Sequence, residues 1–392
     1  MNDAITAAWR RAAGHQRRFD ARFATYLDAL TDPASSPLEI PRHGTFPARA
    51  LQLVRELSLR GGKRLRVTLL HEAAALVTDE SVPGLDEAAI SIELLQTHGL
   101  IHDDIIDDAP TRRGGPSTYY AYRQDFPDRP DTALALAVLA GDLAAFLAGR
   151  VLLTGALPAD RALAMAGVQA DAAAATVAGQ LLDLERDFHP APDTELLHEV
   201  TEYKSTRYSM LAPLRLGLLA AGADLTPHDG ELRRYATALG IANQIHDDWL
   251  DLFGDPESLG KPVGSDIRSG RRSYAVRALL AVCDTGERKL LDEALGAPDC
   301  EAGTLDRIRD IARAHGIDRQ LRADADRYAR MCIRDRRPGP PRGGSAGGRR
   351  PWRSSSTCRP GASPASGSGF GFGFGFGFGF GGSQPGSGRK GR

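Results

Sequence analysis

The stretch IELLQTHGLIHDDIIDD occupies residues 92–108, and its apolar residues recur at the spacing expected of a helix. At about 100° per residue, Asp103 and Asp107 lie within about 40° of each other, and so do Asp104 and Asp108. A proline two residues later predicts that the helix ends here. Four carboxylates at a helix C-terminus repel one another and the helix dipole, and a multivalent cation is the simplest way to compensate their charge. Because carboxylate oxygens are hard ligands, Mg²⁺ is the simplest candidate.

A second acidic motif, QIHDDWLD, occupies residues 244–251 and contains Asp247, Asp248 and Asp251. It also ends an apolar helical segment shortly before a glycine and a proline. A solvated acidic face is the alternative interpretation, but such a face would normally include interleaved Lys or Arg. Two such motifs predict that carboxylates hold several divalent ions on a polyphosphate and neutralise its charge as it leaves.

The rest of the sequence indicates an all-α fold of ten or more helices. Ala and Leu are abundant, apolar residues recur at three- and four-residue steps, and Pro and Gly fall between the segments. No alternating strand pattern appears in the region that is able to form a core.

The net charge of -1 combines two unlike regions. The C-terminal tail (residues 336–392) contains ten basic residues, no acidic residue, 18 of the 43 glycines and 6 of the 13 phenylalanines. Residues 1–335 therefore carry 39 basic and 50 acidic side chains, a net charge of -11. We predict one all-α domain over 1–335. The tail is predicted to be a disordered low-complexity segment or an out-of-frame end of the coding sequence.

Several classes of protein are disfavoured by composition. No apolar run approaches the roughly 20 uncharged residues of a membrane helix, so stable membrane insertion is not expected. The N-terminal residues have no apolar signal segment, and four scattered cysteines suit a reducing compartment, so we expect a cytoplasmic protein. The acidic domain disfavours nucleic-acid binding.

Basic residues that could receive a diphosphate occur beside glycines or close to the acidic motifs. GGKRLR (residues 61–66) precedes a predicted helix start, where backbone N–H groups also favour phosphate, and TRRGG (residues 111–115) follows the first motif. EYKSTRY (residues 202–208) and GKPVGSDIRSGRR (residues 260–272) supply further Lys and Arg. A single basic residue is usually a solvated surface charge, but here their combination favours a binding function.

Seven segments together resemble the trans-isoprenyl diphosphate synthases, or polyprenyl synthetases, over roughly residues 45–330. They are, in order, GGKRLR, ELLQTHGLIHDDIIDD, RRG, GQLLDLE, YKS, GIANQIHDDWLD and GKPVGSDI. The resemblance implies an isoprenoid-synthase-type bundle of ten or more helices around a deep central cavity, and a homodimer. It also implies a trans, head-to-tail condensation of isopentenyl diphosphate with an allylic diphosphate, with release of pyrophosphate. Three Mg²⁺ ions are implied, two at the first motif and one at the second.

The resemblance assigns roles to individual residues. The implied metal ligands are Asp103, Asp107, Asp247 and, in support, Asp251. The implied catalytic residues are Asp103, Asp107, Lys204, Asp247 and Lys261. The implied substrate-binding residues are Gly62, Lys63, Arg66, Gln96, Arg112, Arg113, Lys204, Gln244 and Lys261. Among these, Lys63, Arg66, Gln96 and Arg113 are expected at isopentenyl diphosphate, and Arg112, Lys204 and Lys261 at the allylic diphosphate. One departure from the family pattern, Asn243 in place of a common Phe, could alter substrate packing.

Product length in this family depends on the bulk of the residues that precede the first motif. Gly99 and His98 stand four and five residues before Asp103, where relatives that make farnesyl diphosphate often have aromatic residues. We therefore expect geranylgeranyl diphosphate or a longer product, unless His98 closes the cavity. Four alternatives remain: a farnesyl diphosphate synthase, a class I terpene cyclase, a catalytically silent partner subunit and a scaffold whose function depends on the tail.

Overall fold

The computed structural model describes residues 2–334 except 33, 35, 40, 42, 190 and 256–262. Almost all regular structure in this part of the chain is helical, which confirms the predicted all-α fold of ten or more helices. The described residues form two compact units, one containing residues 2–180 and 202–237 and the other 181–201 and 238–334. The predicted C-terminal tail and Lys261 lie outside the described residues.

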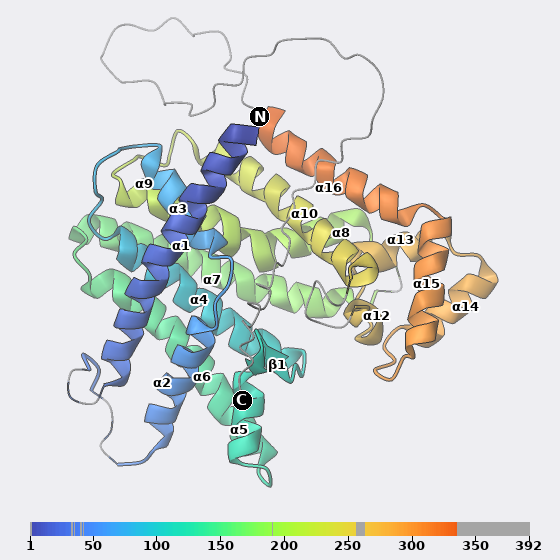
Figure 1. The fold of residues 1–392 in the computed structure, drawn as a ribbon, viewed down its shortest axis with the longest axis horizontal. Helices are drawn as coiled ribbons and strands as arrows, with labels where there is room; N and C mark the ends of the chain where they lie inside the picture. Colours follow the sequence, from blue (N-terminus) through green and yellow to red (C-terminus); the bar gives the residue numbers. More distant parts are fainter. Residues whose placement is uncertain are drawn as a thin grey trace, which may run out of the picture. The chain divides into compact units, whose positions relative to one another are not determined.

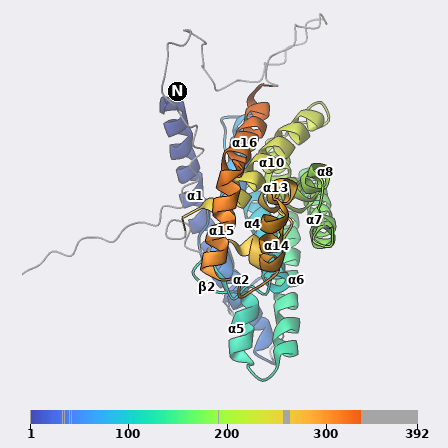
Figure 2. The same ribbon diagram turned by 90° about the vertical axis from the view of Figure 1, so that its right-hand side faces the viewer.

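Nine elements of the described chain lie wholly within the first unit. They are α1 (Asn2–Thr31), α2 (Phe46–Leu59), α3 (Leu65–Ala75), α4 (Leu85–Ile106), β1 (Thr111–Arg112), β2 (Gly115–Pro116), α5 (Thr118–Asp125), α6 (Pro130–Thr154) and α9 (Ala212–Ala220). Three elements run from one unit into the other: α7 (Ala159–Arg186), the π-helix η1 (Thr201–Leu211) and α10 (Asp229–Phe253). Both views of the ribbon show α5 beside α6, as their packing contacts require (Figures 1 and 2).

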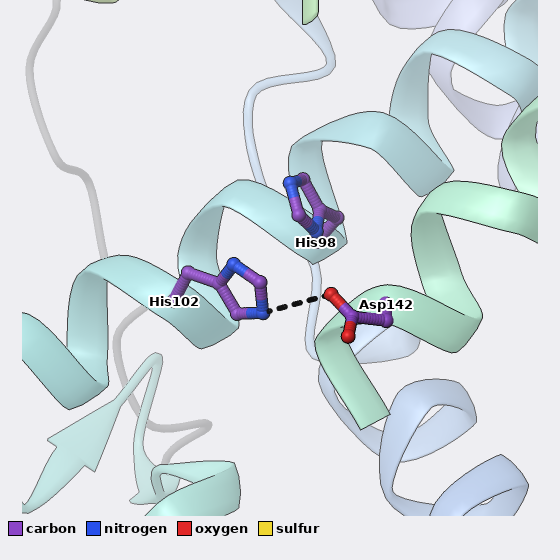
Figure 3. A group of neighbouring side chains, drawn as sticks. All are labelled: His98, His102 and Asp142. Carbon is purple, nitrogen blue, oxygen red and sulfur yellow. Dashed lines mark ion pairs between the residues drawn. The ribbon is translucent and has the colours of Figure 1, made fainter. Parts of the chain in front are cut away.

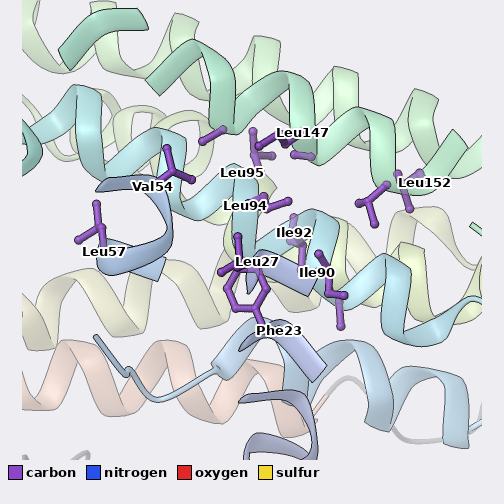
Figure 4. Close-up of a cluster of buried hydrophobic side chains, with 14 of the residues drawn as sticks. Phe23, Leu27, Val54, Leu57, Ile90, Ile92, Leu94, Leu95, Leu147 and Leu152 are labelled. Atoms are coloured by element: carbon purple, nitrogen blue, oxygen red, sulfur yellow. The ribbon is translucent and has the colours of Figure 1, made fainter. Parts of the chain in front are cut away.

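The core of the first unit surrounds α4. Phe23 and Leu27 of α1, Ile92 of α4 and Leu152 of α6 are almost completely buried in one cluster (Figure 4). Burial of each such side chain contributes roughly 1.5–3 kcal/mol. α6 packs on α4 through small residues at helical spacing, namely Ala133, Ala137, Ala140, Ala144 and Ala148. These small side chains let the two helices approach closely.

The second unit contains the shorter helices α8 (Thr194–Val200), α12 (Ser265–Arg268), α13 (Tyr274–Val282), α14 (Thr285–Ala294), α15 (Ala302–Ala314) and α16 (Ile317–Arg334). Leu279, Ile308 and Ile317 are buried in its core. Asp284 and Glu287 form a capping box that begins α14, which satisfies backbone N–H groups at that helix start.

By length and composition alone, α6 and α7 are apolar enough to cross a membrane, contrary to the expectation from the sequence. Within the apolar windows, 44% of α6 and 28% of α7 are buried. α6 also carries Asp142 and Arg150 along its length, and core helices of soluble proteins satisfy the same criteria. The expected cytoplasmic location stays a prediction.

Candidate active site

The first aspartate motif lies where the sequence predicted, at the C-terminal end of α4. The helix ends at Ile106, and Asp107 is its C-cap. Asp103 is partly exposed and Asp107 exposed, whereas Asp104 is fully buried. The motif therefore presents Asp103 and Asp107 to solvent and turns Asp104 inward.

Arg112 joins the two neighbouring carboxylates of this motif. Its Nε donates to Asp104 Oδ1 over 2.7 Å, and its Nη2 pairs with the same oxygen and lies 3.7 Å from Asp103 Oδ2. Burial raises the pKa of Asp104 to about 6, although Arg112 opposes this increase. Within the described residues, the other oxygen, Oδ2, is buried without a hydrogen-bond partner. Asp104 thus positions Arg112 rather than offering itself to solvent.

Arg112 and Arg113 belong to a hairpin, β1–β2, that the sequence did not reveal. The two strands pair Thr111 with Pro116 and Arg112 with Gly115. The two loop residues, Arg113 and Gly114, have φ values of 50° and 75°, as a type I′ turn requires. A non-glycine residue with positive φ is strained, and Arg113 is held there by a 2.6 Å hydrogen bond to Gly61 O.

This hydrogen bond connects the hairpin to the GGKRLR loop. The Arg113 guanidinium covers Gly62, where an added Cβ would lie 3.2 Å from the Arg113 side chain. Gly62 has a φ of +139°, which side chains rarely adopt. The predicted residues Gly62 and Arg113 are therefore neighbours, although fifty residues of sequence separate them. Lys63 follows Gly62 in the same loop.

Arg64 was expected to face a diphosphate, but in the structure its side chain is buried. The residue has a φ of 47°, and its guanidinium bonds to Glu93 at 2.6 Å, Asp20 at 2.8 Å and the carbonyl of Ser58 at 2.8 Å. The sequence grouped Arg64 with the cations available for a diphosphate. The structure corrects this interpretation, because a buried carboxylate already compensates the Arg64 charge.

Arg66 and Gln96 come together through a residue that the sequence analysis did not select. The Tyr208 hydroxyl donates to Gln96 Oε1 over 3.0 Å, and the Arg66 guanidinium lies 4.7 Å from the centre of the Tyr208 ring. Arg66 Nη2 also donates to Ser209 over 2.6 Å. The sequence could have indicated Tyr208 as a site residue, because it lies one helical turn after Lys204 in EYKSTRY.

With the role at isopentenyl diphosphate that the resemblance implies for Gln96, we predict that Tyr208→Phe raises the KM for this substrate about threefold to tenfold and changes kcat less. The ring still stacks on Arg66, but Gln96 loses a hydrogen bond worth about 0.5–1.5 kcal/mol. Initial rates at varied isopentenyl diphosphate measure this effect, and Tyr119→Phe is the matched control. An unchanged KM would show that Gln96 needs no orientation by Tyr208.

Lys204 lies in the π-helix η1, and its Nζ is 3.6 Å from Asp103 Oδ1. A Cβ on Gly179 of α7 would lie 2.1 Å from the backbone nitrogen of Lys204. Only glycine at position 179 allows the two backbones to approach this closely. The π-helix and Gly179 therefore place Lys204 beside the first motif. π-helical turns often occur at functional sites.

The second motif lies near the end of α10, in the second unit. Asp247 is exposed and accepts a 3.0 Å hydrogen bond from Asn243 Nδ2. Asp248 is buried and accepts from Gln244 Nε2 and the backbone N–H of Tyr274, both over 2.8 Å. Burial, together with nearby Asp266, raises the pKa of Asp248 well above its usual range.

Asp251 is buried and tied to the start of α12. One carboxylate oxygen accepts from the backbone N–H of Ser265 over 3.2 Å, and the other from that of Asp266 over 3.0 Å. These N–H groups belong to the first turn of α12 and otherwise lack a helical partner. Asp251 thus has a structural role, and its role as a supporting metal ligand stays a prediction.

The geometry defines an all-α protein with an aspartate-rich helix end surrounded by arginine and lysine. The sequence pattern of the family described as Polyprenyl synthetase matches residues 48–312. This match shows that the chain belongs to the polyprenyl synthetase family, and it confirms the prediction of a trans-isoprenyl diphosphate synthase. The individual site residues stay predictions.

Two relatives and one solved structure illustrate the similarity. The chain is 30% identical to geranylgeranyl diphosphate synthase of Sulfolobus acidocaldarius, over 79% of this chain and 90% of the relative. It is 34% identical to a short chain isoprenyl diphosphate synthase of Methanothermobacter thermautotrophicus, over 64% of this chain and 74% of the relative. The structure of geranylgeranyl pyrophosphate synthase from Corynebacterium glutamicum, complexed with isoprenyl diphosphate and magnesium, is 27% identical with a TM-score of 0.71. That comparison covers 82% of this chain and 91% of that one.

Proposed function

We propose that this enzyme uses Mg²⁺ to condense isopentenyl diphosphate with an allylic diphosphate and releases pyrophosphate. The observation that carries this proposal is the end of α4, where Asp103 and Asp107 are accessible and Arg112 and Lys204 approach Asp103. Carboxylates and cations together suit a metal-bound diphosphate, because the cations contact phosphate oxygens while the carboxylates hold the ions.

We assign the metal ligands to Asp103 and Asp107 of the first motif and to Asp247, supported by Asp251, of the second. Of these, Asp103, Asp107 and Asp247 reach solvent and provide the hard oxygen donors that Mg²⁺ prefers. When bound, Mg²⁺ would neutralise the charge of the departing diphosphate. The number of ions, three in the sequence-based expectation, is part of this proposal.

We assign one group of residues to the allylic diphosphate and a second group to isopentenyl diphosphate. Arg112, held by Asp104, and Lys204 contact the allylic diphosphate in this assignment, together with Lys261. Lys63, Arg66, Gln96 and Arg113 hold isopentenyl diphosphate. The support is that Arg113 contacts the loop containing Gly62, whereas Tyr208 links Arg66 to Gln96. A static anchor suffices for the nucleophile, because charge develops on the other diphosphate during ionisation.

Pyrophosphate release tests the proposed function directly. Purified full-length protein is incubated with isopentenyl and allylic diphosphates, with Mg²⁺ or with excess chelator. We expect release that requires both substrates and Mg²⁺. Release from the allylic diphosphate alone would instead indicate a class I terpene cyclase. A folded protein that releases nothing would indicate a silent partner subunit or scaffold.

We propose geranylgeranyl diphosphate or a longer product, on the basis of the space around Gly99. Apart from its chain neighbours and the adjacent backbone of α4, no described heavy atom lies within 4 Å of a Cβ built at this position. His98 donates to or accepts from Gly141 O at 3.0 Å, so its ring is engaged with α6. Named relatives include geranylgeranyl, geranylfarnesyl and farnesyl diphosphate synthases, so product length needs its own test.

We predict that Gly99→Phe changes the main product to farnesyl diphosphate or a shorter chain. The added ring would occupy the open space and block further elongation. Product sizing after incubation with isopentenyl diphosphate and dimethylallyl diphosphate measures the change. Gly167→Phe is the control, because Gly167 is an exposed glycine of α7 that also has open space around it. Unchanged product length in Gly99→Phe would contradict the proposed location of the cavity floor.

We also propose that the enzyme is a homodimer that uses the exposed face of α6. Leu139, Phe146 and Leu153 recur every seven residues on this face and are 61%, 77% and 62% exposed. A continuous apolar stripe of this kind suits a self-complementary helix contact with a second copy.

We predict that Phe146→Glu weakens dimerisation about 30-fold or more, the effect expected for a central interface residue. Sedimentation equilibrium over a range of concentrations measures this loss. Val282→Glu, which introduces the same charge at an exposed apolar residue elsewhere, is the control. A wild-type protein that stays monomeric, or one that binds neutral lipid vesicles through this face, would contradict the proposal.

A further inference from the structure

His98, His102 and Asp142 form a cluster between α4 and α6 that the proposed reaction does not use. Figure 3 shows both histidines on α4 and the carboxylate on α6, with an ion pair between Asp142 and His102. One ring nitrogen from each histidine and one oxygen of Asp142 all lie within 4.8 Å of one another. Three side chains that each offer a metal-ligand atom therefore converge at one place.

The cluster is separate from the proposed Mg²⁺ ligands. His98 and His102 are four residues apart and share one side of α4, whereas Asp103 lies a further 100° or so around the helix. The two imidazole rings have their centres 4.4 Å apart. The histidines thus face α6, in a different direction from the carboxylate of Asp103.

Gly141 of α6 allows the histidines to approach. A Cβ at this position would lie 2.3 Å from His102 Nε2, so any side chain larger than glycine would displace the His102 ring. The carbonyl oxygen of Gly141 lies 3.0 Å from His98 Nδ1. Metal-binding histidines commonly donate one ring N–H to a backbone carbonyl, which orients the ring and leaves the other nitrogen to bind the ion.

The distances fit one small ion after a modest adjustment. Two ligand atoms about 2.1 Å from a tetrahedral ion lie about 3.4 Å apart. His102 Nε2 and Asp142 Oδ1 are separated by 3.6 Å, close to this value. All three ligand atoms lie within 4.8 Å of one another, so no pair has to close by more than about 1.4 Å to reach the separation at a tetrahedral ion. The partial exposure of His102 and Asp142 allows such a movement, and water can complete the coordination.

We propose that His98, His102 and Asp142 bind a divalent transition-metal ion of the Zn²⁺ or Co²⁺ type. Imidazole favours these ions, whereas Mg²⁺ prefers oxygen ligands throughout. Three protein ligands with a solvent-accessible fourth position give an exchangeable site. The bound ion would join α4 to α6 one turn before Asp103 and stabilise the packing of these helices.

A simpler explanation is that the histidines only hydrogen-bond to α6. His98 reaches Gly141 O, and His102 Nε2 lies 3.2 Å from Val138 O. These bonds would position both rings without a metal. The two explanations differ in the role of Asp142, which is a ligand in one and an exposed partner of His102 in the other.

Visible spectroscopy with Co²⁺ tests the proposal on the full-length protein after chelator treatment. We expect titration to give the intense bands of Co²⁺ in a low-coordinate, imidazole-containing site, and Zn²⁺ to abolish them by competition. The bands should disappear in Asp142→Asn and in His98→Gln, which preserve size and polarity. Asp131→Asn, an exposed carboxylate at the start of the same helix, is the matched control and should retain them.

Co²⁺ can also bind the aspartate motifs, so the same titration is repeated with Asp103→Asn and with excess Mg²⁺. We expect the imidazole bands to persist in both. Wild-type protein without such bands, or bands that survive unchanged in either Asp142→Asn or His98→Gln, would overturn the proposal. Circular dichroism confirms that each variant is folded. The result does not depend on prenyl transfer, because no substrate is present.

Discussion

Asp103→Asn is expected to lower the rate of pyrophosphate release by about 10²–10³-fold at saturating substrate and Mg²⁺. Asp103 is the partly exposed carboxylate that lies 3.7 Å from Arg112 and 3.6 Å from Lys204. Asparagine has the same size but carries no charge, so it weakens metal binding and removes the negative charge beside Arg112 and Lys204, while Asp104 still holds Arg112. The loss should therefore appear mainly in kcat.

Steady-state kinetics and a Mg²⁺ titration measure this effect. The control is Asp128→Asn, which neutralises an exposed carboxylate outside both motifs. If the folded Asp103→Asn variant retains more than about a tenth of the wild-type kcat, Asp103 is not an essential metal ligand. Arg112 and Lys204 would then need another explanation for their positions.

Arg64→Ala is expected to destabilise the protein by about 3–5 kcal/mol. The Arg64 and Glu93 side chains are each only 3% exposed and lie 2.6 Å apart. Removal of the guanidinium leaves the Glu93 charge buried without its partner, and the interactions with Asp20 and the Phe19 ring are lost as well. A lowered midpoint in urea unfolding, monitored by circular dichroism, measures the loss.

Lys63→Ala provides the matched comparison, because Lys63 is the adjacent cation of the same loop. We expect Lys63→Ala to raise the KM for isopentenyl diphosphate with little change in the unfolding midpoint. Equal destabilisation by both variants would contradict the separate roles assigned to the two residues. Unchanged stability in Arg64→Ala would show that the Arg64–Glu93 pair contributes little.

Much of the fold and part of the site could be predicted because the relevant patterns are local. The placement of the first motif at the end of α4 depends on a helical period and a following proline, both of which lie within a few residues. The link between Tyr208 and Gln96 joins residues 112 positions apart, and the bond from Arg66 to Ser209 spans 143. No local spacing predicts such contacts.

The three cations of the GGKRLR loop show a second limit of sequence analysis. Lys63, Arg64 and Arg66 are basic residues of one short segment, and their sequence does not show which of them is buried. Arg64 turns inward because a φ of 47° redirects the chain just before α3 and because Glu93 lies on the helix behind it. The sequence likewise does not show that Asp251 is buried, where its carboxylate accepts hydrogen bonds from the first turn of α12.

The sequence by itself determined the helical class, the two aspartate motifs and the family, because periodicity and motif order are properties of neighbouring residues. Tertiary structure alone decided which charges face solvent and which are buried. It also decided that a hairpin with a strained Arg113 meets the loop of Gly62, and that two histidines meet Asp142 across α4 and α6. The physical reason is that burial and pairing of polar groups depend on the packing of helices that are distant in the chain.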